Sequence, residues 1–371
     1  MTTAAGTAAI AGIGVALPEA VLDQRAVWDG FFRRHFAGGR QAIAQRIFAG
    51  SGVRSRYAVV DPLAEDVSGW STEQRMRRYA QEAQPLGHRA VTAALASAGV
   101  AADEVKLLVV ASCTGYGTPG LDIQLAASLG LPADAQRLLV GHMGCYAALP
   151  ALGSAADFVI ARRRPVVLLC LELTSLHVQP PTDDLQQVVS HALFGDAAVA
   201  LVLTPSPAAT RSRLRFVDLV ALTDTTASAQ MTWDVTNLGF RMGLSPTVPA
   251  VLARHVRPAV KRLLGDHGLD VPDVRGWAIH PGGPAILDTV EQSLELPPHA
   301  LAASRSVLAH RGNCSSPTVL LVLDELMRNG TLNGGGPVVA MAFGPGLTLY
   351  AALLSAQAPS PGPQPRALNP G

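Results

Sequence analysis

Short apolar runs alternate along most of the chain with longer stretches of helical composition. The apolar runs contain few polar positions, so they fit central strands buried on both faces. This alternation predicts an α/β protein whose sheets are mostly buried and covered by helices. The predicted strands are 105–111, 165–173, 197–203, 276–279 and 338–342, and the predicted helices are 86–98, 122–130, 146–162, 248–264 and 317–327.

The alternation occurs twice, once on each side of a polar stretch at 206–213 that has prolines close by. A faint echo between Arg164-Pro165-Val166-Val167 and Gly336-Pro337-Val338-Val339 points to a duplication. The end of the chain is rich in proline and has little to bury, so we expect it to be disordered. The expected parts are an N-terminal half (1–208), a C-terminal half (209–356) and a disordered tail (357–371).

The composition fits a large globular protein. With 371 residues, 49% of them hydrophobic, the chain can bury an extensive core and is long enough for two domains. Its net charge of +1 gives no support to a nucleic-acid partner. The longest apolar runs are far too short to span a bilayer, so we expect no membrane insertion. The four cysteines have no paired or metal-like spacing, which favours reduced thiols in the cytoplasm.

Cys145 is the first candidate for chemistry. It follows the apolar run 137–141 and precedes the alanine-rich helix 146–162, so we expect it in a strand-to-helix turn. Unpaired amides and the macrodipole at a helix N-terminus favour the thiolate, and a nearby imidazolium would favour it further. A buried, inert cysteine is the alternative interpretation.

His280 and Asn313 are the candidates that would act with this cysteine. His280 ends the apolar run 277–279, and the glycines that follow leave room for a substrate to approach its ring. Asn313 precedes the apolar helix 317–327, where an ordinary helix cap is the alternative. An amide that donates a hydrogen bond but cannot ionise suits an oxyanion site. The three residue types together are those needed to form and decarboxylate thioesters.

A family resemblance rests on five ordered motifs that run from about residue 10 to residue 356. On these motifs the chain resembles the type III polyketide synthases, the chalcone synthase-like branch of the thiolase superfamily. The resemblance implies a thiolase-like layered fold of two similar halves, each a mixed sheet covered by helices, and a homodimer. The motifs are Gly144-Cys145, Leu193-Phe194-Gly195-Asp196, His280-Pro281-Gly282-Gly283-Pro284-Ala285-Ile286-Leu287, Gly312-Asn313 with Ser315-Ser316, and Gly344-Pro345-Gly346-Leu347.

The resemblance also implies a reaction. Cys145 would take an acyl group from a starter acyl coenzyme A, and His280 and Asn313 would hold the thioester carbonyl of malonyl coenzyme A while carbon dioxide leaves. The resulting enolate would extend the acyl-cysteine by two carbons, and repeated cycles would end in a pyrone or an aromatic ring. Coenzyme A thioesters are the substrates, and no metal or redox cofactor is called for.

Further positions follow from the resemblance alone. Phe194 matches a gatekeeping aromatic, and Met242 replaces the second gatekeeping phenylalanine. Trp233 and His177 are bulky where the plant chalcone enzyme has small residues, which implies a smaller or redirected cavity. The other expected cavity residues are Cys113, Ser315 and Gly344, and the arginines expected near the coenzyme A phosphates are Arg46, Arg54 and Arg56.

Two other functions remain open at this point. An initiating ketoacyl synthase shares the fold and the three catalytic residue types, but it performs one condensation onto a carrier protein. Its histidine is normally followed by glutamine, alanine and asparagine, whereas His280 is followed by Pro281-Gly282-Gly283. A catalytically silent partner subunit would keep the fold without needing Cys145, His280 and Asn313 together.

Overall fold

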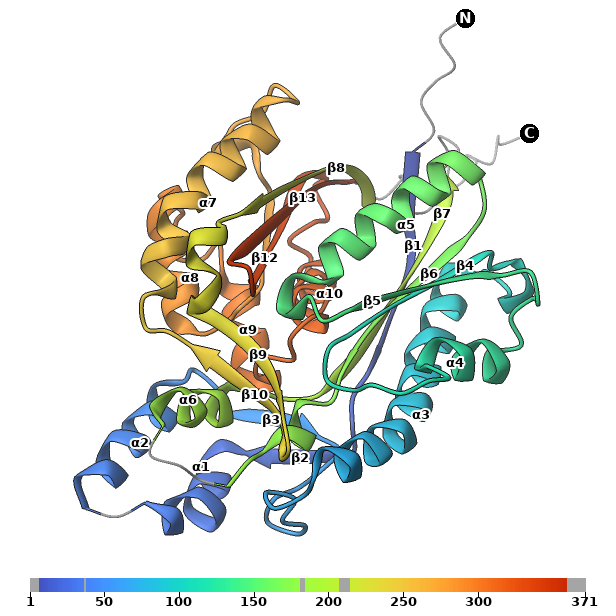
Figure 1. Ribbon diagram of the computed structural model, residues 1–371. Helices are drawn as coiled ribbons and strands as arrows, with labels where there is room; N and C mark the ends of the chain where they lie inside the picture. Colours follow the sequence, from blue (N-terminus) through green and yellow to red (C-terminus); the bar gives the residue numbers. More distant parts are fainter. Residues whose placement is uncertain (1–6, 37, 181–183, 207–213, 359–371) are drawn as a thin grey trace, which may run out of the picture.

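The computed structural model describes residues 7–36, 38–180, 184–206 and 214–358 (Figure 1). Most of the predicted boundary at 206–213 and of the predicted tail at 357–371 lies outside these residues. The strands of the main sheet are β1 (Thr7–Ala16), β4 (Leu107–Ser112), β5 (Gln136–Gly141), β6 (Val166–Glu172), β7 (Ala197–Ser206), β8 (Leu214–Thr223), β11 (Gly276–Ile279), β12 (Gly336–Gly344) and β13 (Thr348–Ala356).

These strands form one mixed nine-stranded sheet in the order β11-β12-β13-β8-β1-β7-β6-β4-β5. The N-terminal strands and the C-terminal strands meet at β1 and β8, which share the pairs Ala9–Arg215 and Ile10–Leu214 within the described residues. Each half contains parallel and antiparallel pairs, as expected. The sequence did not predict that the halves are hydrogen-bonded to each other at an edge.

The two halves repeat one topology. In the N-terminal half β4 is parallel to β6, which is antiparallel to β7, which is antiparallel to β1. The series β11, β12, β13 and β8 shows the same directions. The weak sequence echo falls on β6 and β12, which are equivalent in this comparison. Helix α5 (Ala148–Arg162) precedes β6, and α10 (Pro317–Arg328) precedes β12 in the same way.

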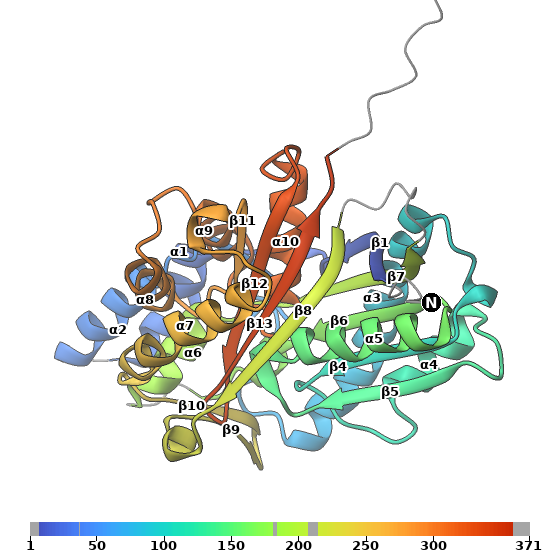
Figure 2. The same ribbon diagram turned by 90° about the horizontal axis from the view of Figure 1, so that it is seen from above.

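Helices form three layers around the sheet (Figures 1 and 2). Helices α5 and α10 share one apolar cluster between the halves. Helices α3 (Thr72–Ala98) and α4 (Leu121–Leu129) cover the outer face of the N-terminal half, and α7 (Val248–Gly265) and α8 (Pro284–Leu294) cover that of the C-terminal half. Strand β6 alternates between two of these clusters, so it is buried on both faces and its run is continuously apolar.

Smaller elements gather beside the sheet, at the lower left of Figure 1. An aromatic cluster that includes Trp28, Phe32 and Phe48 holds the N-terminal ones together. The hairpin β9–β10 forms a separate two-stranded sheet.

The remaining described elements, in all parts of the molecule, have the following bounds: β2 (Ala20–Asp23), β3 (Ser55–Ala58), β9 (Met231–Thr236), β10 (Gly239–Leu244), α1 (Gln24–Val27), α2 (Gly38–Gly50), α6 (Leu185–Leu193) and α9 (Ala302–Arg311), with short helical turns at Trp28–Phe32, Arg33–His35, Ala102–Glu104, Gly144–Tyr146, Thr174–His177, Thr225–Gln230 and Val271–Asp273.

The predicted strands and helices are confirmed, with differences at their ends. The largest difference is in α3, which the sequence predicted to start at residue 86. The helix continues through Pro85 instead of ending there, so it is longer than predicted. It begins at Thr72, where Ser71 caps the N-terminus and forms a capping box with Gln74. Pro150 lies in the first turn of α5, where the missing amide hydrogen costs little.

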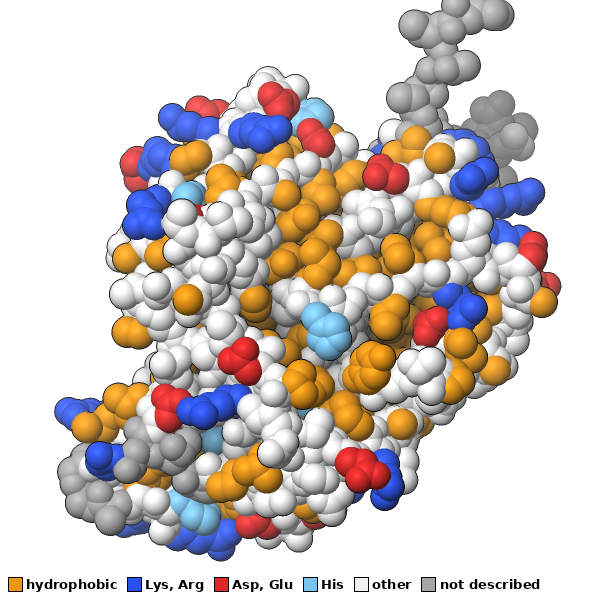
Figure 3. Space-filling model, in the orientation of Figure 1, with side chains coloured by type: hydrophobic (Ala, Val, Ile, Leu, Met, Phe, Trp, Pro, Cys, Tyr) orange, Lys and Arg blue, Asp and Glu red, His pale blue; other side chains and the backbone are white. Residues whose placement is uncertain are grey.

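Hydrophobic side chains gather on the face that carries α5 and β5 (Figure 3). Leu138 and Leu139 on the edge strand β5 are 40% and 53% exposed. Among the described residues one helical segment, Gly144–Arg162, is long and apolar enough to cross a membrane. Its most apolar window is 67% buried, which is typical of the core helix that α5 forms here.

Candidate active site

Cys145 lies in the turn Gly144–Tyr146 between β5 and α5, where the sequence placed it. Gly144 has a φ of 77°, a conformation that suits glycine, and a Cβ at this position would lie 2.9 Å from the Cδ of Pro345. Gly344 approaches from the same side, and a Cβ there would lie 2.6 Å from the Tyr146 ring. The turn that presents the cysteine is therefore packed directly against the segment that follows β12.

His280 follows β11 and is almost fully buried, with 1% of its surface exposed. Its backbone amide donates to the Met341 carbonyl at 2.8 Å, which continues the β11–β12 pairing. Neither ring nitrogen has a hydrogen-bond partner among the described residues. Burial lowers the pKa of the imidazole to about 3, so the ring is neutral at neutral pH. Buried polar atoms without partners are uncommon, and here they mark a ring that is available to a ligand.

Asn313 is held by both its backbone and its side chain. Its amide donates to the Leu193 carbonyl at 2.8 Å, and its carbonyl accepts from Gly195 at 3.0 Å, so it is fixed on both sides of Phe194. Its Oδ1 accepts from the Ser315 amide at 2.8 Å. Because the oxygen is occupied in this way, the NH₂ group is the end left to donate at the site.

The segments of His280 and Asn313 both reach Leu193, the last residue of α6. A Cβ at Gly283 would lie 3.6 Å from a Leu193 methyl group, and Asn313 is hydrogen-bonded to the Leu193 carbonyl. The side chains of Asn313 and Ser315 are close enough to Cys145 to lower the pKa of its thiol. The structure thus brings Asn313 close to Cys145, and the segment of His280 meets that of Asn313 at Leu193.

Burial dominates the charge state of the nucleophile. It raises the pKa of the Cys145 thiol to about 11, and hydrogen bonds from Ser315 and Asn313 offset only part of this shift. Burial of this 6% exposed thiol therefore acts against the predicted effect of the helix terminus. Thiol and imidazole are both neutral at rest.

A cavity opens beside Cys145. Phe194, Trp233, Met242, Cys113 and Ser315 line it, so the structure brings these predicted residues together. His177 and Gly344 are not part of this lining: His177 lines the adjoining cavity, and Pro345 is the residue of the Gly344 segment that reaches the cavity. The full lining is Cys113, Thr114, Gly144, Cys145, Thr174, Phe194, Trp233, Met242, Ser315 and Pro345.

Glu172 was not predicted, although it lies next to this cavity. Its fully buried carboxylate accepts hydrogen bonds from the Cys113 amide at 2.9 Å, Thr114 Oγ1 at 2.7 Å and Ser316 Oγ at 2.7 Å. Burial, together with this carboxylate, raises the pKa of the Cys113 thiol well above its usual value, so the thiol is neutral. A single acidic residue at the end of the apolar strand β6 was the sequence feature that could have revealed Glu172.

The predicted arginines differ from one another. Arg46 on α2 and Arg54 after it are exposed. Arg56 is 4% exposed, and its Nη1 donates to the carbonyl oxygens of His191 at 2.6 Å and Phe194 at 2.9 Å. Its expected contact with coenzyme A phosphates is corrected, because the guanidinium is used to hold the end of α6.

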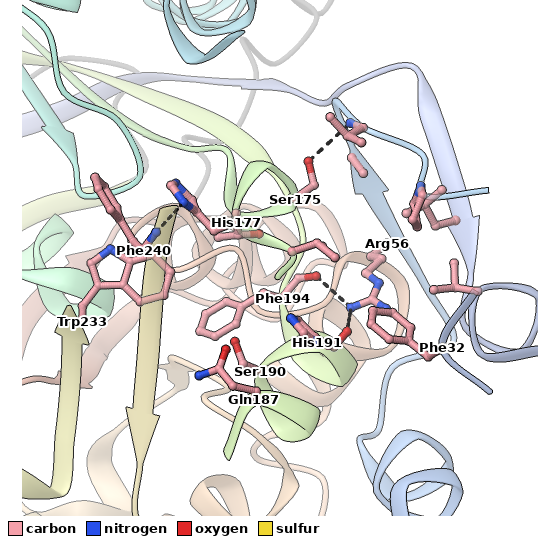
Figure 4. Close-up of a pocket in the computed structure, with 17 residues that line it drawn as sticks. Phe32, Arg56, Ser175, His177, Gln187, Ser190, His191, Phe194, Trp233 and Phe240 are labelled. Atoms are coloured by element: carbon pink, nitrogen blue, oxygen red, sulfur yellow. Dashed lines mark hydrogen bonds between the residues drawn. The ribbon is translucent and has the colours of Figure 1, made fainter. Parts of the chain in front are cut away.

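A second cavity adjoins the first and shares Thr174, Phe194 and Trp233 with it (Figure 4). His177 and Phe240 line this second cavity together with residues from the N-terminal elements, among them Phe32. The Trp233 ring belongs to both linings, so it lies between the two cavities.

A buried cysteine that lines a cavity, with a buried asparagine close to it, between repeated α/β halves is typical of thiolase-like enzymes that condense thioesters. The chain belongs to the chalcone and stilbene synthase family, the type III polyketide synthases, which are acyltransferases. The family model for the N-terminal domain of chalcone and stilbene synthases matches residues 1–207, and that for the C-terminal domain matches 221–357. The resemblance seen in the sequence is thereby confirmed.

Similar proteins come from several groups of organisms. The chain is 33% identical over 356 residues to the alpha-pyrone synthesis polyketide synthase-like Pks18 of Mycobacterium tuberculosis, covering 92% of this chain and 89% of the relative. It is 33% identical over 329 residues to a 1,3,6,8-tetrahydroxynaphthalene synthase of Streptomyces peucetius, covering 85% and 84%.

Solved structures agree in fold. PKS-I from the brown alga Ectocarpus siliculosus superposes with a TM-score of 0.89 at 26% identity, covering 96% of this chain and 100% of the other. ORAS, a fungal type III polyketide synthase, gives a TM-score of 0.87 at 25% identity, covering 94% and 100%. The expected thiolase-like layered fold is therefore confirmed.

Proposed function

We propose that this enzyme condenses malonyl coenzyme A units repeatedly onto an acyl coenzyme A starter, or onto malonyl coenzyme A itself, and cyclises the chain to a pyrone or a phenolic product. The observation that carries the proposal is the orientation of Asn313, whose oxygen is occupied by Ser315 and whose NH₂ group is left to donate beside the buried Cys145 thiol. The names of the relatives, which include synthesis of an alpha-pyrone and of tetrahydroxynaphthalene, point to the same chemistry.

Loading begins with two neutral groups. As the Cys145 sulfur attacks the starter thioester carbonyl, its proton passes to the unpartnered imidazole of His280. The carbon–sulfur bond to coenzyme A then breaks, and the departing thiolate takes that proton. The products are an acyl-cysteine, free coenzyme A thiol and a neutral imidazole that is ready for the next step.

Extension uses the same imidazole as a hydrogen-bond donor. A ring N–H of His280 and the NH₂ group of Asn313 donate to the thioester oxygen of malonyl coenzyme A. The bond to the carboxylate breaks, carbon dioxide leaves, and the electron pair forms an enolate whose oxygen these two donors stabilise. The enolate carbon attacks the acyl-cysteine carbonyl, and the Cys145 thiolate is released as the chain moves to coenzyme A.

Exposed side chains support proposals about substrate entry and assembly. The exposed side chains of Arg46 and Arg54 are available to the phosphates of coenzyme A. Exposed leucines on the open edge strand β5 support a homodimer that covers this face, because long apolar strand edges are usually paired or covered. The four cysteines are buried and form no disulfide, which supports a cytoplasmic enzyme. The proposed halves of this enzyme are 1–208 and 209–356.

Mass spectrometry of products tests the proposed function. The full chain is given malonyl coenzyme A and a panel of acyl coenzyme A starters, with and without an acyl carrier protein. Products that differ by successive two-carbon units without the carrier are expected. Condensation only with the carrier would assign the chain to the ketoacyl synthases instead, and no condensation under either condition would indicate a silent partner subunit.

Trp233→Gly is expected to lengthen the product. Removal of the indole joins the two cavities that it separates, so the growing chain gains room, and the longest product should gain at least one malonyl-derived unit. Val235→Gly is the matched control, because Val235 lies on the same strand and is 68% exposed. An unchanged product profile in the Trp233 variant would show that the indole does not limit the chain.

A further inference from the structure

His177 joins two backbone segments that belong to different walls of the catalytic cavity. Its Nε2 lies 2.6 Å from the Thr114 carbonyl oxygen, and its Nδ1 accepts from the Phe240 amide at 3.0 Å. Because the Phe240 amide can only donate, Nδ1 must be the unprotonated nitrogen and Nε2 must carry the hydrogen that Thr114 accepts. Both hydrogen bonds therefore require a neutral ring in one tautomer.

The neutral ring is secured by its surroundings. His177 is 5% exposed, and burial lowers its pKa to about 4, with Arg75 contributing in the same direction. The ring is stacked on Phe240 at 4.5 Å between centroids, with an angle of 11° between the planes. Its edge meets Trp233 at 5.6 Å and 78°. These three rings line the second cavity (Figure 4), and Trp233 also lines the cavity at Cys145.

The hairpin β9–β10 depends on such side-chain contacts. It has no strand pairing with the nine-stranded sheet among the described residues, yet it carries Trp233 and Met242 of the cavity lining. The indole Nε1 of Trp233 donates to the Cys113 carbonyl at 2.8 Å, one residue before the carbonyl that His177 binds. His177 and Trp233 thus link the hairpin to two consecutive carbonyls of the segment that follows β4. Two glutamines also hold β10: Gln179 Nε2 donates to the Phe240 carbonyl at 3.2 Å, and Gln187 Nε2 donates to the Met242 carbonyl at 2.6 Å.

We propose that His177 is a positioning residue that holds the hairpin β9–β10 against Thr114 and thereby sets the chain length of the product. Its ring lies outside the cavity lining at Cys145, so it acts through Trp233 and Phe240 and not by contact with the chain. The inference rests on the proposed function. It differs from a role in filling space, because it assigns the effect to two hydrogen bonds.

His177→Phe and His177→Gln separate these two roles. Phenylalanine keeps a stacked ring but leaves the Thr114 carbonyl and the Phe240 amide without their partner, whereas glutamine can still donate and accept at a similar reach. The ratio of longer to shorter products should change by at least about tenfold in the phenylalanine variant, because two buried hydrogen bonds are lost. It should stay within about twofold in the glutamine variant, because both bonds can re-form.

Two further readouts make the test independent of folding and of the proposed function. Trp233→Phe removes the bond to the Cys113 carbonyl and part of the ring between the two cavities, and its product ratio should shift in the same direction as that of His177→Phe. Malonyl coenzyme A decarboxylation, which relies on His280 and Asn313, should change by less than about threefold in both His177 variants, since no donor to the enolate is removed.

The outcomes are distinguishable. A wild-type enzyme that makes no polyketide would contradict the proposed function itself. With an active wild type, an unaltered ratio in His177→Phe, or in Trp233→Phe if the former does not fold, would overturn only the role given to His177. Equal shifts in the phenylalanine and glutamine variants would assign the effect to side-chain size and would overturn it as well.

Discussion

Cys145→Ala is expected to abolish acyl loading and polyketide formation, with a loss of at least about a thousandfold, because no other group replaces a covalent nucleophile. The substitution removes a single sulfur atom from a buried turn, so the fold should persist. Intact-protein mass spectrometry after incubation with an acyl coenzyme A measures the loading, and product analysis measures the synthesis.

Cys170→Ala is the matched control for this substitution. Cys170 is equally buried, but it lies in the core strand β6 and outside the cavity lining. This variant should still gain the mass of one acyl group. An acyl adduct on the Cys145→Ala protein, or continued polyketide synthesis by it, would show that another residue carries the chain.

Asn313→Ala is expected to slow malonyl coenzyme A decarboxylation by about 10²–10³-fold, the usual cost of removing one oxyanion donor. Loading of Cys145 should fall less, because the Ser315 hydroxyl remains beside the thiol. Release of carbon dioxide measures the first rate, and formation of the acyl-enzyme measures the second.

Asn313→Asp tests whether the donor matters or only the shape. Aspartate keeps the acceptor for the Ser315 amide but has no NH₂ group to offer, so it should be as impaired in decarboxylation as alanine. Equal losses in loading and decarboxylation, or near-normal decarboxylation by the aspartate variant, would contradict the division of labour between Cys145 and Asn313.

The strands that are apolar throughout could be predicted from the sequence, whereas a strand whose residues are chosen for close packing against a helix was missed. Strands such as β6 are apolar throughout because helices cover both faces, and that pattern is visible in the sequence. Strand β1 was not predicted, because its glycines disfavour a strand in isolation. They are there because α3 packs against them: a Cβ at Gly12 would lie 2.3 Å from the Ala94 carbonyl, and one at Gly14 would lie 2.2 Å from that of Ala90.

The site shows the same division. The candidate catalytic residues, Phe194 and Ser315 could be named because each stands in a recognisable motif, whereas Cys113, Trp233 and Met242 followed from the family resemblance alone. The roles of Arg56 and His177 could not, since both depend on hydrogen bonds to backbone carbonyls and amides that no sequence motif records. The burial of the turn that carries Cys145, which raises the pKa of its thiol, was also not visible in the sequence.

The repeated topology has an electrostatic consequence for the cavity. Helices α5 and α10 are equivalent copies, and their N-termini directly follow Cys145 and the Asn313–Ser316 segment. Two helix macrodipoles thus direct their positive ends toward one reaction centre, and the lining of that cavity contains no lysine or arginine among the described residues. Each half therefore contributes the partial positive charge of one helix N-terminus, which is made from backbone alone and is insensitive to the titration of any side chain.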